Sequence, residues 1–190
     1  MQNKLSQKGF TLLLTIIVIS VVLAVTMSSL NVGIKQVRLS ADTRDSEVAF
    51  HAANAGLECL RFWRRGSQST NFENGNSVDI NCFDSGDVSP NTRTTDIVPG
   101  AHLYEYQIEW GDPGRCSQMR FIVMTSPNEA TLEISDIQDY LPGYPTDTKE
   151  CPAGGRCTAA LSQGYSTGCP NNIDDSFPLG TIQREIFVEF

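Results

Sequence analysis

Residues 10 to 30 read FTLLLTIIVISVVLAVTMSSL, a run without a charged side chain. A helix of about 20 predominantly apolar residues is long enough to cross the hydrocarbon core of a bilayer. No proline interrupts residues 10 to 65, and all nine prolines of the chain lie at or beyond Pro90. Because proline is the usual cause of a kink or stop in a helix, the sequence predicts one helix that includes the apolar run and continues far beyond it.

A short polar leader precedes the apolar run. Residues 1 to 9, MQNKLSQKG, contain Lys4 and Lys8 and no acidic residue. Positive charge beside a membrane helix favours the cytoplasmic side, so we expect a single-pass protein in the cytoplasmic membrane with its N-terminus inside the cell. Lys35 and Arg38 on the other side of the run reduce this bias.

A cleaved secretory signal is the main alternative interpretation of this segment. Such a signal has a shorter apolar stretch that ends at a small-x-small cleavage site, and Ala24-Val25-Thr26 loosely matches one. The apolar run continues past these residues, however, and the helical pattern follows without a break. The sequence therefore favours a retained helix over a secreted domain that starts near residue 27.

Residues 31 to 65 continue the helix with a different pattern. Apolar and small residues recur at helical spacing on one side, while charged and polar residues occupy the other. The expected buried stripe is Phe50, Ala53, Leu57 and Leu60, widened by Ala49, Ala52, Gly56, Cys59 and Trp63. The expected exposed face is Asp42, Arg44, Asp45, Glu47, Asn54, Glu58 and Arg61. This amphipathic half of the helix should lie on the core of a soluble domain.

Residues 66 to 190 form the expected globular domain. After Gly66 the sequence becomes rich in Ser, Asn, Gly and Asp, which is typical of loops. Alternating or continuous apolar residues then predict strands at 103–110, 120–125, 130–135 and 182–190. Because each element has one apolar face to bury, the predicted fold class is α+β, with the long N-terminal helix packed on an antiparallel sheet of about four or five strands.

Six cysteines lie on the C-terminal side of the apolar run. An even number on one side of a membrane indicates disulfides in an oxidising, extracellular compartment. Position suggests that Cys59 on the helix pairs with Cys82, at the end of an expected strand, and that Cys151 and Cys157 close a small ring around Pro-Ala-Gly-Gly-Arg. Cys116 and Cys169 are left to pair at the sheet. This is one of 15 possible connectivities.

Charge and motif content argue against several classes of function. The formal net charge is −8, whereas a nucleic-acid binder needs a surplus of Lys and Arg on one face. The sequence has no Gly-rich phosphate loop, no GxSxG and no HExxH motif, so we expect neither an enzyme nor a cofactor. Paired C-x-x-C units are also missing, and a zinc site is therefore not expected.

Two acidic loops carry oxygen atoms of the kind that bind calcium. One is Asp84-Ser-Gly-Asp87, and the other contains Asn171, Asn172, Asp174 and Asp175. Neither has the ligand spacing of an EF-hand, so plain solvated loops are the favoured interpretation. His51 and His102 are expected to be ordinary surface or half-buried residues.

The junction Lys8-Gly9-Phe10-Thr11-Leu12 resembles the processing site of type IV prepilins and of type II secretion pseudopilins. In that family a dedicated prepilin peptidase cuts after the Gly on the cytoplasmic side, and the new N-terminal Phe is usually methylated. The resemblance implies cleavage between Gly9 and Phe10, N-methylation of Phe10, and a core position in a filament for residues 10 to 30. It also implies other pilin subunits as partners and an extracellular filament as the final location.

A second stretch, residues 45 to 58, reads DSEVAFHAANAGLE and is similar to a helix segment of minor pilins of the PilX type. That similarity implies a pilin-like arrangement of helix and sheet. The small residues Ala49, Ala52, Ala53 and Gly56 agree with it, because they would let a sheet or a neighbouring helix approach the backbone closely.

Leu14 departs from the pattern of the major pilins, which carry Glu at this fifth position after the cut. In the family that carboxylate is thought to neutralise the terminal ammonium of the adjacent subunit, a pairing that matters in an apolar filament core. Minor pilins of the PilX type and the tip pseudopilin also lack the Glu, so the resemblance implies a minor subunit. The alternative is a membrane-anchored extracellular adhesion or binding domain that never polymerises.

Overall fold

The computed structural model describes residues 3–112, 114–173 and 175–190, with side chains omitted for residues 3–9, 93, 95 and 96. It contains one long N-terminal apolar helix and an antiparallel sheet, which confirms the α+β class. The chain divides into two compact units, Met1–Thr43 and Arg44–Phe190. The first unit is helical throughout its described residues, and the second holds the sheet.

The helix α1 runs from Asn3 to Arg65 without a break, so it contributes to both units. In the first unit every described side chain from Phe10 onward is exposed, and only Gly33 is partly covered. In the second unit α1 becomes one wall of the domain, as the amphipathic pattern predicts. It is followed by the short helix α2 (Ser69–Glu73).

Five antiparallel strands form the main sheet in the order β1-β2-β3-β6-β7. Their bounds are β1 (Thr92–Val98), β2 (Ala101–Trp110), β3 (Arg115–Thr125), β6 (Arg156–Tyr165) and β7 (Gln183–Glu189). A separate two-stranded sheet joins β4 (Leu132–Ser135) to β5 (Thr148–Cys151), with the 3-10 helix η1 (Ile137–Asp139) between them.

Four of the expected strands are present in the structure. The strands expected at 103–110, 120–125, 130–135 and 182–190 correspond to β2, β3, β4 and β7, although β3 begins earlier, at Arg115. The sequence did not predict β1, β5 or β6. The strand expected to end at Cys82 is wrong, because only one isolated bridge, Ile80 to Val88, forms there.

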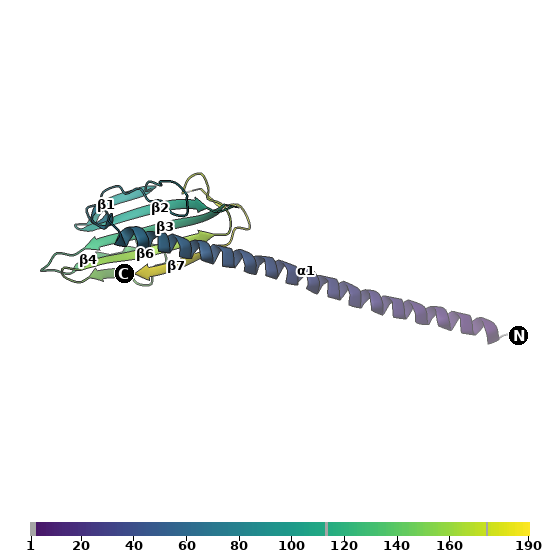
Figure 1. Cartoon of the computed structure of the whole chain (residues 1–190). Helices are drawn as coiled ribbons and strands as arrows, with labels where there is room; N and C mark the ends of the chain where they lie inside the picture. The colour runs from purple at the N-terminus through teal and green to yellow at the C-terminus, as the bar shows by residue number, and fades with distance from the viewer. Residues whose placement is uncertain (1–2, 113, 174) are drawn as a thin grey trace. The chain divides into compact units, whose positions relative to one another are not determined.

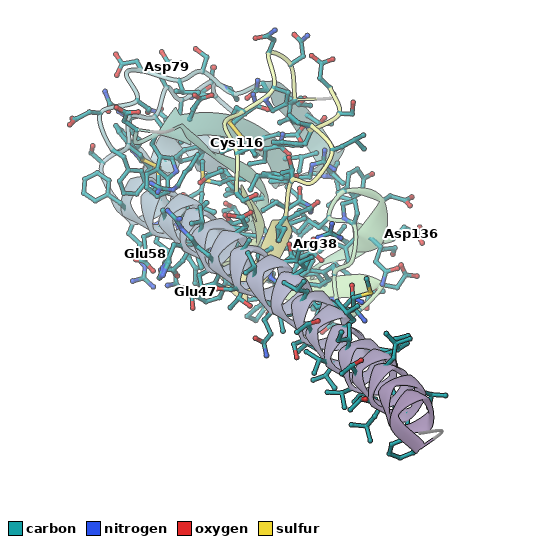
Figure 2. The ribbon with its side chains drawn as sticks, turned by 90° about the vertical axis from the view of Figure 1, so that its right-hand side faces the viewer. Arg38, Glu47, Glu58, Asp79, Cys116 and Asp136 are labelled. Atoms are coloured by element: carbon teal, nitrogen blue, oxygen red, sulfur yellow. A yellow bond between two sulfur atoms is a disulfide. The ribbon has the colours of Figure 1, made fainter. Side chains whose placement is uncertain are left out.

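The C-terminal part of α1 lies across one face of the sheet (Figure 1). Ala49, Ala52 and Ala53 are fully buried there, and Leu57 and Leu60 nearly so. Glu47 and Glu58 project from the other side of the helix, away from the sheet (Figure 2).

Phe50 was assigned to the buried stripe, and this is wrong, since its side chain is 51% exposed. It lies in line with Asn54 and Glu58, four and eight residues further along, and both of these are exposed.

The helix backbone comes unusually close to β6 and β3. A Cβ atom added at Gly164 would lie 2.1 Å from the carbonyl oxygen of Ala49 and 2.1 Å from the nitrogen of Ala53. Beside this glycine the hydroxyls of Ser117 and Ser162 each donate a hydrogen bond of 2.7 Å to a helix carbonyl. These acceptors are Ala52 O and Ala53 O, so the buried hydroxyls keep a partner.

Two hydrophobic clusters fill the sheet unit, one on each face. The first lies between α1 and the sheet and includes Leu60, Phe72, Tyr104 and Phe121. The second lies on the opposite face, where η1 and the β4–β5 pair cover part of β2, β3 and β6. His102 on β2 is 7% exposed, so the expectation of a surface or half-buried residue is wrong.

Three disulfides join all six cysteines. The bonds are Cys59–Cys82, Cys116–Cys169 and Cys151–Cys157, the same pairs that position suggested. The first ties α1 to the loop region that follows it, and the second ties the start of β3 to the long segment between β6 and β7. The third closes a ring between β5 and β6.

We predict that Gly164→Ala lowers the free energy of unfolding of the sheet unit by about 3 kcal/mol, because the new methyl group overlaps helix backbone that cannot rotate away. Urea denaturation of the full chain in detergent, followed by tryptophan fluorescence, measures this. Trp63 and Trp110 both belong to the sheet unit.

The matched control is Gly33→Ala. A Cβ atom at Gly33 meets nothing within 4 Å, so the sheet unit should unfold as in the wild type. Equal stability of the two variants would contradict the close approach of α1 to β6.

Candidate functional site

The apolar part of α1 is the most unusual surface of the chain. Its large side chains are at least half exposed, from 69% at Phe10 to 50% at Leu14 and 67% at Leu30. The most apolar window of the helix has a mean hydropathy of 2.7. By length and composition this helix can span a membrane, and an uncovered apolar surface of this size requires lipid or protein around it.

Four of the polar side chains in residues 10 to 30, Thr15, Ser20, Thr26 and Ser29, donate to carbonyl groups of their own helix. The hydroxyl of Thr15 donates to Leu12 O at 2.8 Å, that of Ser20 to Ile17 O at 2.8 Å, and that of Ser29 to Val25 O at 3.0 Å. Hydrogen-bonding groups must find partners inside the chain when no water is present. The segment therefore suits an apolar environment despite its serines and threonines.

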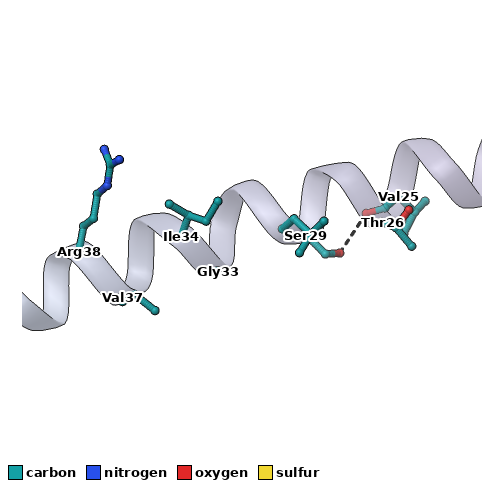
Figure 3. A pocket seen from close by; sticks show the side chains of 8 residues that line it. Val25, Thr26, Ser29, Gly33, Ile34, Val37 and Arg38 are labelled. Atoms are coloured by element: carbon teal, nitrogen blue, oxygen red, sulfur yellow. Dashed lines mark hydrogen bonds between the residues drawn. The ribbon is translucent and has the colours of Figure 1, made fainter.

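A shallow hollow marks the helix surface around Gly33 (Figure 3). Its lining residues all belong to this one helix and are Val25, Thr26, Ser29, Leu30, Gly33, Ile34, Val37 and Arg38. A single helix cannot enclose a ligand, so the hollow is a notch and not a binding cavity. Small residues at such notches allow two helices to approach closely in apolar surroundings.

The expected processing junction lies within α1. Gly9 and Phe10 are both helical, and the Phe10 side chain is exposed. Leu14 follows one turn later, so it shares a helix face with Phe10. A residue at position 14 is thus placed beside any terminus created at position 10. The side chains of Lys4 and Lys8 lie outside the described set.

Arg64, near the C-terminal end of α1, and Arg156 on β6 both bond to Glu73 in the sheet unit, and we call these three residues the clamp. The carboxylate of Glu73, 8% exposed, accepts a hydrogen bond of 2.8 Å from Arg64 Nη1 and another from Arg156. Arg64 also donates from Nε to the hydroxyl of Thr158 at 3.0 Å. Burial alone would raise the pKa of Glu73, but the hydrogen bonds from Arg156 and Arg64 outweigh it and hold the pKa below its usual value.

In each acidic loop one carboxylate accepts a hydrogen bond from a nearby asparagine side chain. Asp87 accepts from the amide of Asn81, and Asp175 accepts from Asn172. Asp174, the other acid of the second loop, lies outside the described residues. In the part of the chain that the structure describes, no three His, Cys, Asp or Glu side chains gather as a metal site would require.

The sequence did not predict two of the charged arrangements in the sheet unit. One is the clamp at Glu73, and the other is an ion pair between Glu105 and Arg120. The alternation along residues 103–110 predicted that Glu105 lies on the polar face of its strand. It did not predict the partner Arg120, because the register between two strands cannot be deduced from one strand alone.

Comparison with protein-family models, with curated proteins and with solved structures finds no match to this chain.

We predict that Glu73→Gln lowers the free energy of unfolding by about 3 kcal/mol at pH 7, because it removes the negative charge and puts an NH2 group in place of one of the two oxygens that accept from Arg64 and Arg156, of which Arg64 is buried. A carboxyl group with a lowered pKa stabilises the folded state above its unfolded pKa, and this contribution is lost as the pH falls through the folded value.

The difference between wild type and Glu73→Gln should therefore shrink in acid. Urea denaturation at a series of pH values between neutral and strongly acidic measures it. Glu133→Gln, on the exposed side of β4, serves as the control and should change the free energy of unfolding by less than about 0.5 kcal/mol at pH 7. A penalty for Glu73→Gln that stays constant with pH would contradict the clamp.

Proposed function

We propose that this chain is a minor structural subunit of a type IV pilus-like filament, made as a single-pass membrane precursor and cut between Gly9 and Phe10. One observation carries the proposal: the Gly-Phe junction lies at the start of the charge-free segment of α1, residues 10 to 30, whose side chains are all exposed. The new terminus would be the first residue of that apolar helix.

The exposed apolar surface supports assembly with other subunits. Before assembly, lipid would cover residues 10 to 30, and afterwards neighbouring helices would replace the lipid. In the sheet unit, the α1 side chains Phe50 and Phe62 are 51% and 72% exposed. Neither side chain belongs to a hydrophobic cluster of the domain, and contact with a neighbouring subunit would explain why both are exposed.

Leu14 supports a minor position over a shaft position. In the family scheme an incoming subunit offers a Glu at this position to the terminal ammonium of the subunit already above it. A subunit with nothing above it would bury an unpaired carboxylate, which costs several kcal/mol in apolar surroundings. Leucine avoids that cost, so we place this chain at or near the tip, where assembly begins.

The three disulfides support an extracellular location for the sheet unit. Every described cysteine is paired, and such bonds persist in oxidising compartments. The same observation suits the alternative of a membrane-anchored binding domain that does not polymerise. Mass spectrometry of the mature N-terminus separates the candidates: methylated Phe10 supports the filament subunit, retained Met1 the anchor, and a start near residue 27 a secreted domain.

We predict that Gly9→Leu leaves residues 1–9 on the protein, because the peptidase requires a small residue beside the scissile bond. Intact mass measurement of membrane-extracted protein detects the retained leader. Gly9→Ala, which keeps a small side chain, is the matched control and should still be processed. A Gly9→Leu protein with the mature mass of the wild type would show that cleavage occurs elsewhere.

We predict that this chain is scarce in isolated filaments relative to a major pilin that carries Glu at the fifth position. Quantitative proteomics of sheared filaments measures the ratio of the two subunits. If this chain were the dominant component, the filament would satisfy its terminal ammonium in another way, and the tip assignment would be wrong.

A further inference from the structure

A partly enclosed hollow of about 230 Å³ lies on the face of the sheet opposite α1. Glu105, Arg120 and Leu161 occupy paired positions on β2, β3 and β6. Their chain neighbours Tyr104, Met119 and Ala160 belong to the cluster on the helix side, and side chains alternate along a strand. Pro142, beyond η1, and Ile173, in the segment between β6 and β7, form walls of the hollow.

An ion pair at the floor of this hollow leaves one acceptor and one donor unused. Arg120 Nε donates to Glu105 Oε1 at 2.8 Å, and Arg120 Nη2 donates to the same oxygen. Neither Glu105 Oε2 nor Arg120 Nη1 bonds to any described residue. The Glu105 side chain is only 10% exposed, and a carboxylate so deeply placed gains from every additional hydrogen bond it accepts.

A chain of side-chain amides fixes the polar surroundings of this pair. Tyr165 donates to Gln118 Oε1 at 3.0 Å, Gln118 donates to Gln107 Oε1 at 2.9 Å, and Gln107 donates to Pro170 O at 2.6 Å. Burial, together with the negative charge of Glu185, raises the pKa of Tyr165 to about 12. Its hydroxyl therefore remains a donor at neutral pH, and the direction of the chain is fixed.

Gln163 is the polar side chain of the hollow that is most available to a ligand. Its Oε1 lies 3.3 Å from the Tyr165 hydroxyl, whose proton goes to Gln118 at the shorter distance of 3.0 Å, and its Nε2 donates to Glu185 at 3.3 Å. Hydrogen bonds of this length lie beyond the usual range and are weak. A ligand atom at better distance can replace either one.

A hydroxyl group matches the unused atoms at the floor. It accepts one hydrogen bond and donates another, so it can receive from Arg120 Nη1 and give to Glu105 Oε2 without separating the ion pair. A zwitterionic amino acid would have to divide the pair, with its carboxylate on Arg120 and its ammonium on Glu105. The unlike charges already neutralise one another, which leaves the hollow suited to an uncharged ligand.

The volume of the hollow and the residues of its walls further restrict the kind of ligand that it can hold. At about 30 Å³ per water molecule in the liquid, the hollow of about 230 Å³ has room for roughly eight waters, and it is smaller than the roughly 300 Å³ or more of most drug-sized pockets. Leu161, Pro142 and Ile173 present apolar surface beside the polar floor. A single ring with hydroxyl groups on its edge and C–H groups on its faces fits both surfaces.

We propose that this hollow binds one neutral sugar residue, which places two adjacent hydroxyl groups on the Glu105–Arg120 pair and Gln163. The apolar walls contact the C–H groups of the ring.

Saturation-transfer NMR of the full chain in detergent tests the proposal with methyl pyranosides of glucose, galactose, mannose and N-acetylglucosamine as probes. At least one pyranoside should receive saturation at its ring protons, and free glycine and alanine should receive none. Glu105→Gln should weaken binding about tenfold or more, because a hydrogen bond to a charged acceptor is replaced by one to a neutral amide.

Gln163→Ala tests the site without disturbing the ion pair, and it should also weaken binding. Glu133→Gln, on β4 and outside the hollow, is the matched control and should bind as the wild type does. Circular dichroism of each variant verifies the fold. The proposal is overturned if no pyranoside binds, if glycine or alanine binds instead, or if binding is unchanged in both Glu105→Gln and Gln163→Ala.

Discussion

The sheet unit depends on the contact between the backbone of α1 and the backbones of β3 and β6. Gly164 leaves no space for a side chain beneath Ala49 and Ala53, and a Cβ atom at Gly56 would lie 2.7 Å from the hydroxyl of Ser162. Large residues on either side would push the helix away from the sheet. This constraint explains why the helix face is rich in alanine and why the facing strands carry glycine and serine.

The same contact determines which polar side chains can be buried between the helix and the sheet. Ser117 and Ser162 are fully buried, and each is acceptable only because a helix carbonyl accepts its hydroxyl proton. Beyond the close contact the spacing widens, so that Leu60, Phe72 and Phe121 fill the gap. At the end of the helix the Cys59–Cys82 bond and the clamp at Glu73 fasten α1 in place. Along α1, the contact with the rest of the domain thus changes from small residues to large apolar residues, and then to the disulfide and the ion pairs of Glu73.

The sequence predicted those elements whose residues show a periodic pattern. The continuous helix was visible because residues 10 to 65 contain no proline, and β2 was visible because its aromatic residues alternate with Glu and Gln. Strand β6 was not, since its run of Ala, Ser and Gly has a low β propensity by itself and is explained only by the helix that lies on it. The pair of Glu105 with Arg120 requires the register of β2 and β3, which a single sequence does not contain.

The two faces of the sheet leave room for two separate roles. Strand β6 presents Ser162 and Gly164 to α1 on one face, and Leu161 and Gln163 to the hollow on the other, because successive side chains alternate. A neighbouring subunit that covers the exposed Phe50 and Phe62 would contact α1. It would thus meet the helix and not the face that carries Glu105 and Arg120. A ligand in the hollow and a partner on α1 therefore do not compete for surface, and the domain can be held by its helix while the hollow on its opposite face stays accessible.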